Sequence, residues 1–112
     1  MKYKVIFLQA ALDDLEQIVA YIAQDNVNAA LRLHDRIIET ANKLSDFPMI
    51  GRLVPDEKIG KHGFRMTGHG NYIMFYNVYD NDNKVVVLRV LHGARDYPSL
   101  LIPGKDTEQD KQ

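Results

Sequence analysis

The sequence predicts an α+β fold in which a helical hairpin packs on one face of a mainly antiparallel sheet. Apolar residues alternate near the start of the chain, then recur at three- and four-residue steps from about Ala10. Strand-like apolar runs return after about residue 63. A short polar link separates the two helical stripes, which indicates antiparallel helices. The expected order is therefore strand, helix, helix and three strands, written βααβββ.

The first strand and the two helices follow from local patterns. Residues 3–8 alternate aromatic or β-branched side chains with others, which is typical of a strand. Residues 12–22 form an apolar helical stripe, and the acids Asp13, Asp14 and Glu16 at its start favour a helix N-terminus. Residues 25–28 interrupt this stripe and supply capping side chains for a second helix.

The second half of the chain predicts a loop and three strands. Phe47-Pro48 ends the second helix, and glycines and prolines mark a loop to about residue 63. The strand candidates are residues 64–67, 72–79 and 85–92, with a polar hairpin turn at residues 80–83.

The last predicted strand carries one arginine among apolar residues, and the alternation of its side chains predicts which face of the sheet the arginine occupies. Period-two alternation predicts that Val86, Leu88 and Val90 face the helices. The opposite, uncovered face is then expected to carry Arg89 together with Val85, Val87 and Leu91. An arginine on an uncovered sheet face predicts a binding surface.

Composition predicts one globular domain over residues 1–102, followed by a flexible polar tail at residues 103–112. The chain is 46% hydrophobic and 26% charged. It has no cysteine, which excludes disulfides, thiolate metal sites and cysteine nucleophiles. The histidine spacing matches no metal motif, so we expect neither metal nor cofactor. No apolar run approaches the roughly 20 residues of a membrane span, and we expect a cytoplasmic protein.

Charge is unevenly distributed along the chain. Fourteen Lys+Arg against fifteen Asp+Glu give a net charge of -1, which argues against binding nucleic acid by bulk charge. Residues 50–95, however, hold seven of those cations and only four of the acids. We therefore expect any anion-binding surface in this middle block.

Three stretches carry more specific motifs. They are Ala11–Ile18 with Tyr21-Ile22, the Phe-Pro-Met-Ile-Gly-Arg segment at residues 47–52, and residues 72–76 with residues 87–96. In this order they resemble the RelE/ParE superfamily of toxins from type II toxin–antitoxin systems, over roughly residues 3–100. The resemblance implies a compact βααβββ toxin that a cognate antitoxin wraps in a hetero-oligomer.

Members of this superfamily act in two unrelated ways, and RelE-like members cut mRNA in the ribosomal A site. Such cleavage needs a base, an acid and a cation at the phosphate, but no metal. The resemblance to Gly-x-Arg implies a functional role for Arg95 in Gly93-Ala94-Arg95. His92 or Tyr97 would then transfer protons, and Arg65 would clamp the phosphate.

ParE-like members instead poison DNA gyrase, and several features favour this alternative. Ile73 stands where RelE-like nucleases often have arginine, and Leu101 stands where some keep a tyrosine. The Leu91-His92-x-x-Arg95-Asp96 ending resembles ParE-like chains. In this interpretation the side chains expected to contact the target are those of Arg89, Arg95, Arg65, Arg52 and Lys61. Whether the chain is an enzyme stays open, and a third alternative is a chain that only occupies an antitoxin.

Overall fold

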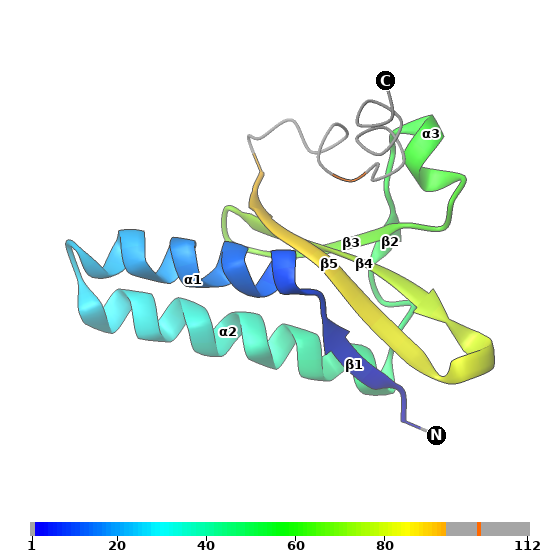
Figure 1. Ribbon diagram of the computed structural model, residues 1–112, viewed down its shortest axis with the longest axis horizontal. Helices are drawn as coiled ribbons and strands as arrows, with labels where there is room; N and C mark the ends of the chain where they lie inside the picture. Colours follow the sequence, from blue (N-terminus) through cyan, green and yellow to red (C-terminus); the bar gives the residue numbers. More distant parts are fainter. Residues whose placement is uncertain (1, 94–100, 102–112) are drawn as a thin grey trace.

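The computed structural model describes residues 2–93 and residue 101. Its elements are β1 (Lys4–Phe7), α1 (Gln9–Ala23), α2 (Val27–Asp46), β2 (Arg52–Leu53), α3 (Glu57–Gly60), β3 (Arg65–His69), β4 (Tyr72–Tyr79), the 3-10 turn η1 (Asp80–Asp82) and β5 (Lys84–His92). Three helices pack against the sheet, and the α+β class is confirmed (Figure 1). The loop expected up to residue 63 contains β2 and α3, which the sequence did not predict. The proposed tail at residues 103–112 lies outside the described residues.

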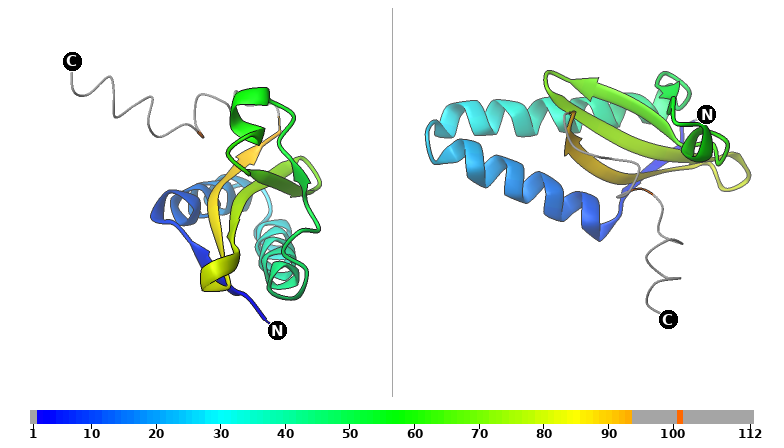
Figure 2. Two further views of the ribbon diagram at one scale, coloured as in Figure 1. Left: turned by 90° about the vertical axis from the view of Figure 1, so that its right-hand side faces the viewer. Right: turned by 90° about the horizontal axis from the view of Figure 1, so that it is seen from above.

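The strands form one sheet in the order β1-β5-β4-β3-β2. β1 runs parallel to β5, with Val5 opposite Val85 and Phe7 opposite Val87. The other neighbours are antiparallel, which confirms the mainly antiparallel prediction. The two long helices lie side by side and extend past one end of the strands (Figure 2).

The helix boundaries follow from capping. The Asn26 side chain accepts a hydrogen bond from the Ala29 N–H at 3.0 Å, which confirms the expected cap of the second helix. Phe47 is the C-cap of α2, and Pro48 follows it. No helix in the described part of the chain is long and apolar enough to cross a membrane.

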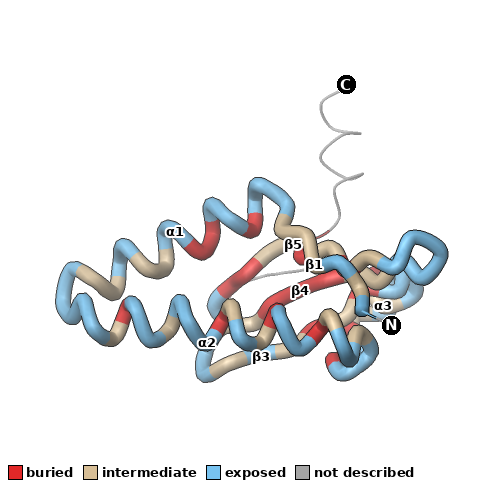
Figure 3. The backbone as a smooth tube through the Cα atoms, turned by 90° about the horizontal axis from the view of Figure 1, so that it is seen from below, coloured by how far each residue is buried: buried red, intermediate tan, exposed pale blue. Residues whose placement is uncertain are grey.

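One core fills the space between the helical hairpin and the sheet. It is built from small and branched side chains of both helices and from β4 and β5, and Figure 3 shows these buried stretches facing one another. Its fully packed members are Ala11, Leu15, Ile37, Ala41, Leu44, Met74, Tyr76, Val85, Val87 and Val90.

A second core covers the other face of the sheet. The segment between α2 and β3 contributes Val54, Ile59 and Phe64, and these residues pack over Phe75 of β4. Leu101 joins the same cluster and is 1% exposed. The expectation of an uncovered sheet face is therefore wrong at its centre, because the apolar residues of the supposed loop fold back onto it.

A β-bulge corrects the predicted facing of the last strand. Phe75 lies opposite Arg89, but its neighbour Tyr76 lies opposite Val87, so Leu88 is an extra residue. Before the bulge Val85 and Val87 pack in the helix-side core, and Leu88 packs against the second core. The predicted facing is wrong for these three residues, because the extra residue shifts the alternation by one position.

Candidate functional site

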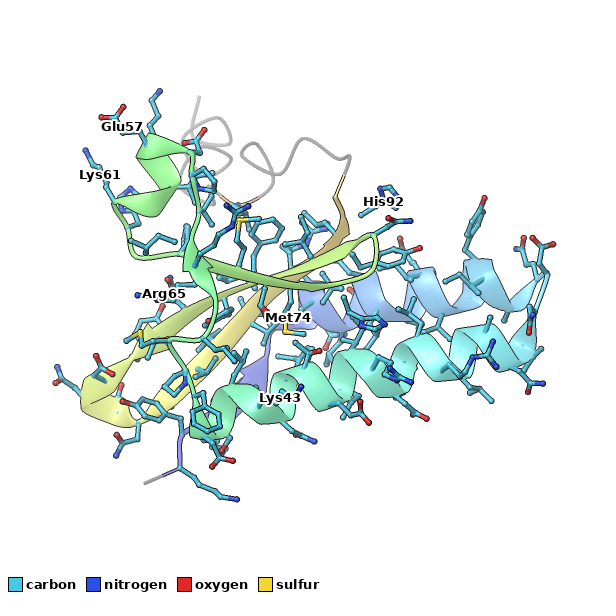
Figure 4. The ribbon with its side chains drawn as sticks, turned by 180° about the vertical axis from the view of Figure 1, so that it is seen from behind. Lys43, Glu57, Lys61, Arg65, Met74 and His92 are labelled. Atoms are coloured by element: carbon cyan, nitrogen blue, oxygen red, sulfur yellow. The ribbon has the colours of Figure 1, made fainter. Side chains whose placement is uncertain are left out.

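Two of the predicted nuclease residues lie far apart. Arg65 pairs with Tyr76 across β3 and β4, whereas His92 pairs with Tyr72 across β5 and β4. These two positions are four residue steps apart on β4, or about 13 Å along the strand. Figure 4 accordingly shows Arg65 and His92 at different ends of the sheet. The structure does not bring them together, and Arg95 and Tyr97 lie outside the described residues.

His92 lies at the exposed end of β5. Its ring meets the ring of Tyr72 edge-to-face, with centroids 5.5 Å apart. The surrounding hollow has a volume of about 490 Å³ and includes side chains of α1 such as Gln17 and Tyr21. The described residues contain no cluster of histidine and carboxylate side chains able to hold a metal ion.

Arg89 forms a two-bonded ion pair with Asp14 of α1. Its Nε and Nη2 atoms each donate to one carboxylate oxygen at 2.7 Å. The hydrogen bond to the Asp14 carboxylate raises the pKa of Arg89. The expectation that Arg89 projects from an uncovered face is wrong, because its guanidinium reaches α1.

The Asp14 carboxylate also accepts a backbone hydrogen bond at the edge of β5. β1 pairs with β5 only as far as Val87, so among the described residues the next part of β5 has no neighbouring strand on that side. Asp14 Oδ2 accepts the Val90 N–H at 3.0 Å and takes the place of a strand acceptor. Asp14 is 9% exposed, so it is part of the packed structure and not only of a helix-start charge cluster.

Arg65 and Tyr76 hold the backbone of Gly51 from two sides. Arg65 Nη1 donates to the Gly51 carbonyl at 2.7 Å, and the Gly51 N–H donates to the Tyr76 hydroxyl at 2.9 Å. A Cβ atom at residue 51 would lie 2.6 Å from the Met66 carbonyl oxygen and from the Tyr76 hydroxyl oxygen. Only glycine fits there, which explains the glycine of the 47–52 motif. Arg52 follows it in β2, the strand at the edge of the sheet.

The buried hydroxyl of Tyr76 is expected to make the stability of the fold depend on pH. Burial raises the pKa of the Tyr76 hydroxyl, an effect that the Gly51 hydrogen bond and the Arg65 charge oppose. The unfolded tyrosine ionises near pH about 10 while the native one keeps its proton, so this residue stabilises the fold less as pH rises above about 10. Tyr76→Phe is expected to cost about 1–3 kcal/mol at neutral pH, because it leaves the Gly51 N–H without an acceptor.

Urea unfolding at pH 7 and above pH 10 checks this prediction. The stability gap between wild type and Tyr76→Phe is expected to narrow at the higher pH, whereas Tyr79→Phe, at a position 46% exposed, changes little at either pH. A gap that stays constant or widens would contradict this role for Tyr76.

Among the predicted target-binding cations that the structure describes, Arg52 and Lys61 are exposed. Among the residues that the structure describes, neither side chain forms a hydrogen bond or an ion pair. Lys61 lies at the end of α3, near Glu57 (Figure 4). These two side chains can therefore contact a partner without breaking an internal bond.

Sequence reasoning missed the internal roles of Asp14 and Tyr76. The signal for Asp14 was present, since it lies between Ala11 and Ile18 on the apolar stripe of α1 and not on its polar side. A carboxylate at a buried helical position requires a charged or hydrogen-bonding partner. Nothing local identifies Arg89 as that partner, 75 residues away.

Solved structures of bacterial toxin–antitoxin proteins share this architecture. The RelBE2 toxin–antitoxin complex of Mycobacterium tuberculosis matches with a TM-score of 0.63 and 26% identity, over 82% of this chain and 99% of that chain. A chain of the chromosomal ParDE system of P. aeruginosa matches with a TM-score of 0.64 and 18% identity, over 81% and 96% of the two chains. The isolated E. coli RelE toxin gives 0.53 and 15%, over 96% and 97%. The fold is that of RelE/ParE superfamily toxins.

The sequence itself assigns the family. The family model of the ParE toxin of the type II toxin–antitoxin system parDE matches residues 5–97. This chain therefore belongs to the ParE toxin family of type II toxin–antitoxin systems. A search of curated proteins gave no match.

Proposed function

We propose that this toxin arrests growth by binding DNA gyrase, as the ParE-like motifs imply. The observation that carries the proposal is the placement of the cations. Arg89 is paired with Asp14, and Arg65 holds Gly51 at one end of the sheet while His92 lies at the other. These described residues do not form a common acid–base set around one phosphate, as RNA cleavage requires.

The surface around β2 supports a protein target. The segment at residues 47–53, which contains Arg52, carries four apolar side chains that are each about half exposed or more: Phe47, Met49, Ile50 and Leu53. Protein interfaces combine such apolar contacts with arginine, whereas RNA backbone contacts depend on repeated positive charge. We propose that the target binds this basic and apolar segment together with Lys61.

The helical hairpin supports an antitoxin partner. A groove of about 480 Å³ on the helices is lined mainly by apolar side chains, together with one acid and one histidine: Leu12, Leu15, Glu16, Val19 and Ala20 of α1 and His34 of α2. Leu12 is 45% exposed there. An apolar groove between helices fits the apolar face of a partner helix, and two of the matched structures are toxin–antitoxin systems. We propose that the cognate antitoxin covers this groove in a hetero-oligomer.

Controlled induction of the chain in bacteria tests the function. We expect growth arrest in which DNA synthesis stops before protein synthesis. Arg52→Glu combined with Lys61→Glu should weaken the arrest by about tenfold or more, because opposite charges at an interface disfavour binding. The matched control is Lys2→Glu with Lys4→Glu, on the N-terminal segment and β1 at the opposite edge of the sheet.

Two outcomes would contradict this function. Translation that stops first, with new mRNA ends that disappear in Arg95→Ala, would assign the RelE-like nuclease activity instead. Normal growth after induction would instead support the third alternative, in which the chain binds an antitoxin and has no toxic activity.

A further inference from the structure

A small basic pocket lies on the helix side of the molecule, between α2 and the end of β3. It has a volume of about 280 Å³ and is lined by Ala29, Arg32, Leu33, Arg36 and His69. The turn between β3 and β4 lies next to the middle of α2 (Figure 3). The pocket contains neither Arg52 nor Lys61 and is separate from the proposed target surface.

The two arginines of this pocket are poorly neutralised within the chain. Arg32 and Arg36 lie one turn apart on α2, a spacing at which like charges destabilise a helix. Arg36 Nε lies 3.9 Å from Glu39 Oε1 on the exposed surface, a geometry that contributes little. Arg32 has no ion-pair or hydrogen-bond partner among the described residues.

The fold adds a third donor to these two. The pairing of His69 with Tyr72 ends the β3–β4 ladder, and His69 lines the same pocket as the two arginines of α2. A neutral imidazole still donates one N–H, and each guanidinium presents a planar fork of donors. Leu33 and Ala29 form the apolar part of the lining.

We propose that this pocket binds a phosphate group. Guanidinium forks match phosphate oxygens with two parallel hydrogen bonds, which makes arginine the side chain most suited to recognising a phosphate group. The site goes beyond the proposed gyrase contact and the antitoxin groove, since its lining belongs to neither. The phosphate can come from solution or from a nucleic acid backbone.

Binding measurements on the purified full-length chain test the site. Inorganic phosphate and a fluorescent single-stranded 12-mer oligonucleotide serve as separate probes, with Arg32→Ala/Arg36→Ala compared with wild type. Lys2→Ala/Lys4→Ala removes the same charge elsewhere. We expect the arginine variant to bind at least one probe about tenfold more weakly, and the lysine variant to stay within about twofold of wild type.

The two probes separate the sources of the phosphate. If the backbone of a nucleic acid occupies the pocket, the salt dependence of oligonucleotide binding should also fall, by a slope of about 1.4 for two lost contacts. If solution phosphate occupies it, only the affinity for inorganic phosphate changes. Equal affinities of wild type and Arg32→Ala/Arg36→Ala for both probes would overturn the proposal, as would displacement of both probes by a polyglutamate peptide at lower concentration than by phosphate. Neither result depends on growth arrest.

Discussion

Replacing Asp14 with alanine is expected to lower the free energy of unfolding by about 3 kcal/mol. The change leaves the largely buried Arg89 guanidinium without its carboxylate and the Val90 N–H without its acceptor. Both groups lose partners in a region shielded from water, where replacement contacts are costly to form. Urea unfolding monitored by circular dichroism measures the loss.

Matched variants distinguish this ion pair from a general effect of charge. Asp13→Ala removes an exposed acid one position earlier, and it should change stability by no more than about 0.5 kcal/mol. Adding Arg89→Met to Asp14→Ala should restore part of the loss, since the uncompensated cation is then removed. If Asp14→Ala were as stable as Asp13→Ala, the anchoring of α1 to the β5 edge would be wrong.

Leu101→Ala is expected to cost about 3 kcal/mol of stability, because it opens a cavity in the second core. Leu101 is 1% exposed among residues of β3, β4 and the segment before β3. Thermal unfolding measures the effect, and Leu53→Ala, at an edge position 50% exposed, is the control of equal size. The control should shift the midpoint much less.

The same variant tests why a leucine stands where some RelE-like nucleases keep a tyrosine. If Leu101 acts only by packing in the second core, Leu101→Ala protein that is folded at low temperature should inhibit DNA gyrase as strongly as the wild type does. A variant that remained as stable as wild type but lost toxicity would instead place this position in the target contact.

Local patterns explain why the long elements could be predicted. α1, α2, β4 and β5 each carry a sustained helical or strand period, and Asn26 supplies a cap that needs no distant partner. β2 and α3 are only two and four residues long and carry too little periodicity to detect. β2 exists because Arg52 and Leu53 pair with β3, a contact made outside the segment itself.

The candidate site was harder to predict because its contacts are non-local. Period-two alternation predicted an exposed Arg89, but its guanidinium reaches Asp14 of α1, a partner 75 residues away that no strand pattern reveals. Arg65 was expected to bind phosphate, yet its position opposite Tyr76 brings it to the Gly51 carbonyl. Arg52 and Lys61 stay exposed, and their sequence neighbours alone could not distinguish them from the arginines that the fold engages.

Supercoiling by purified DNA gyrase in the presence of this toxin tests the central claim most directly. The account predicts that the toxin inhibits supercoiling in a concentration-dependent way, and that Arg52→Glu/Lys61→Glu inhibits much less than Lys2→Glu/Lys4→Glu. Full supercoiling activity at a large excess of folded toxin would contradict the proposed target.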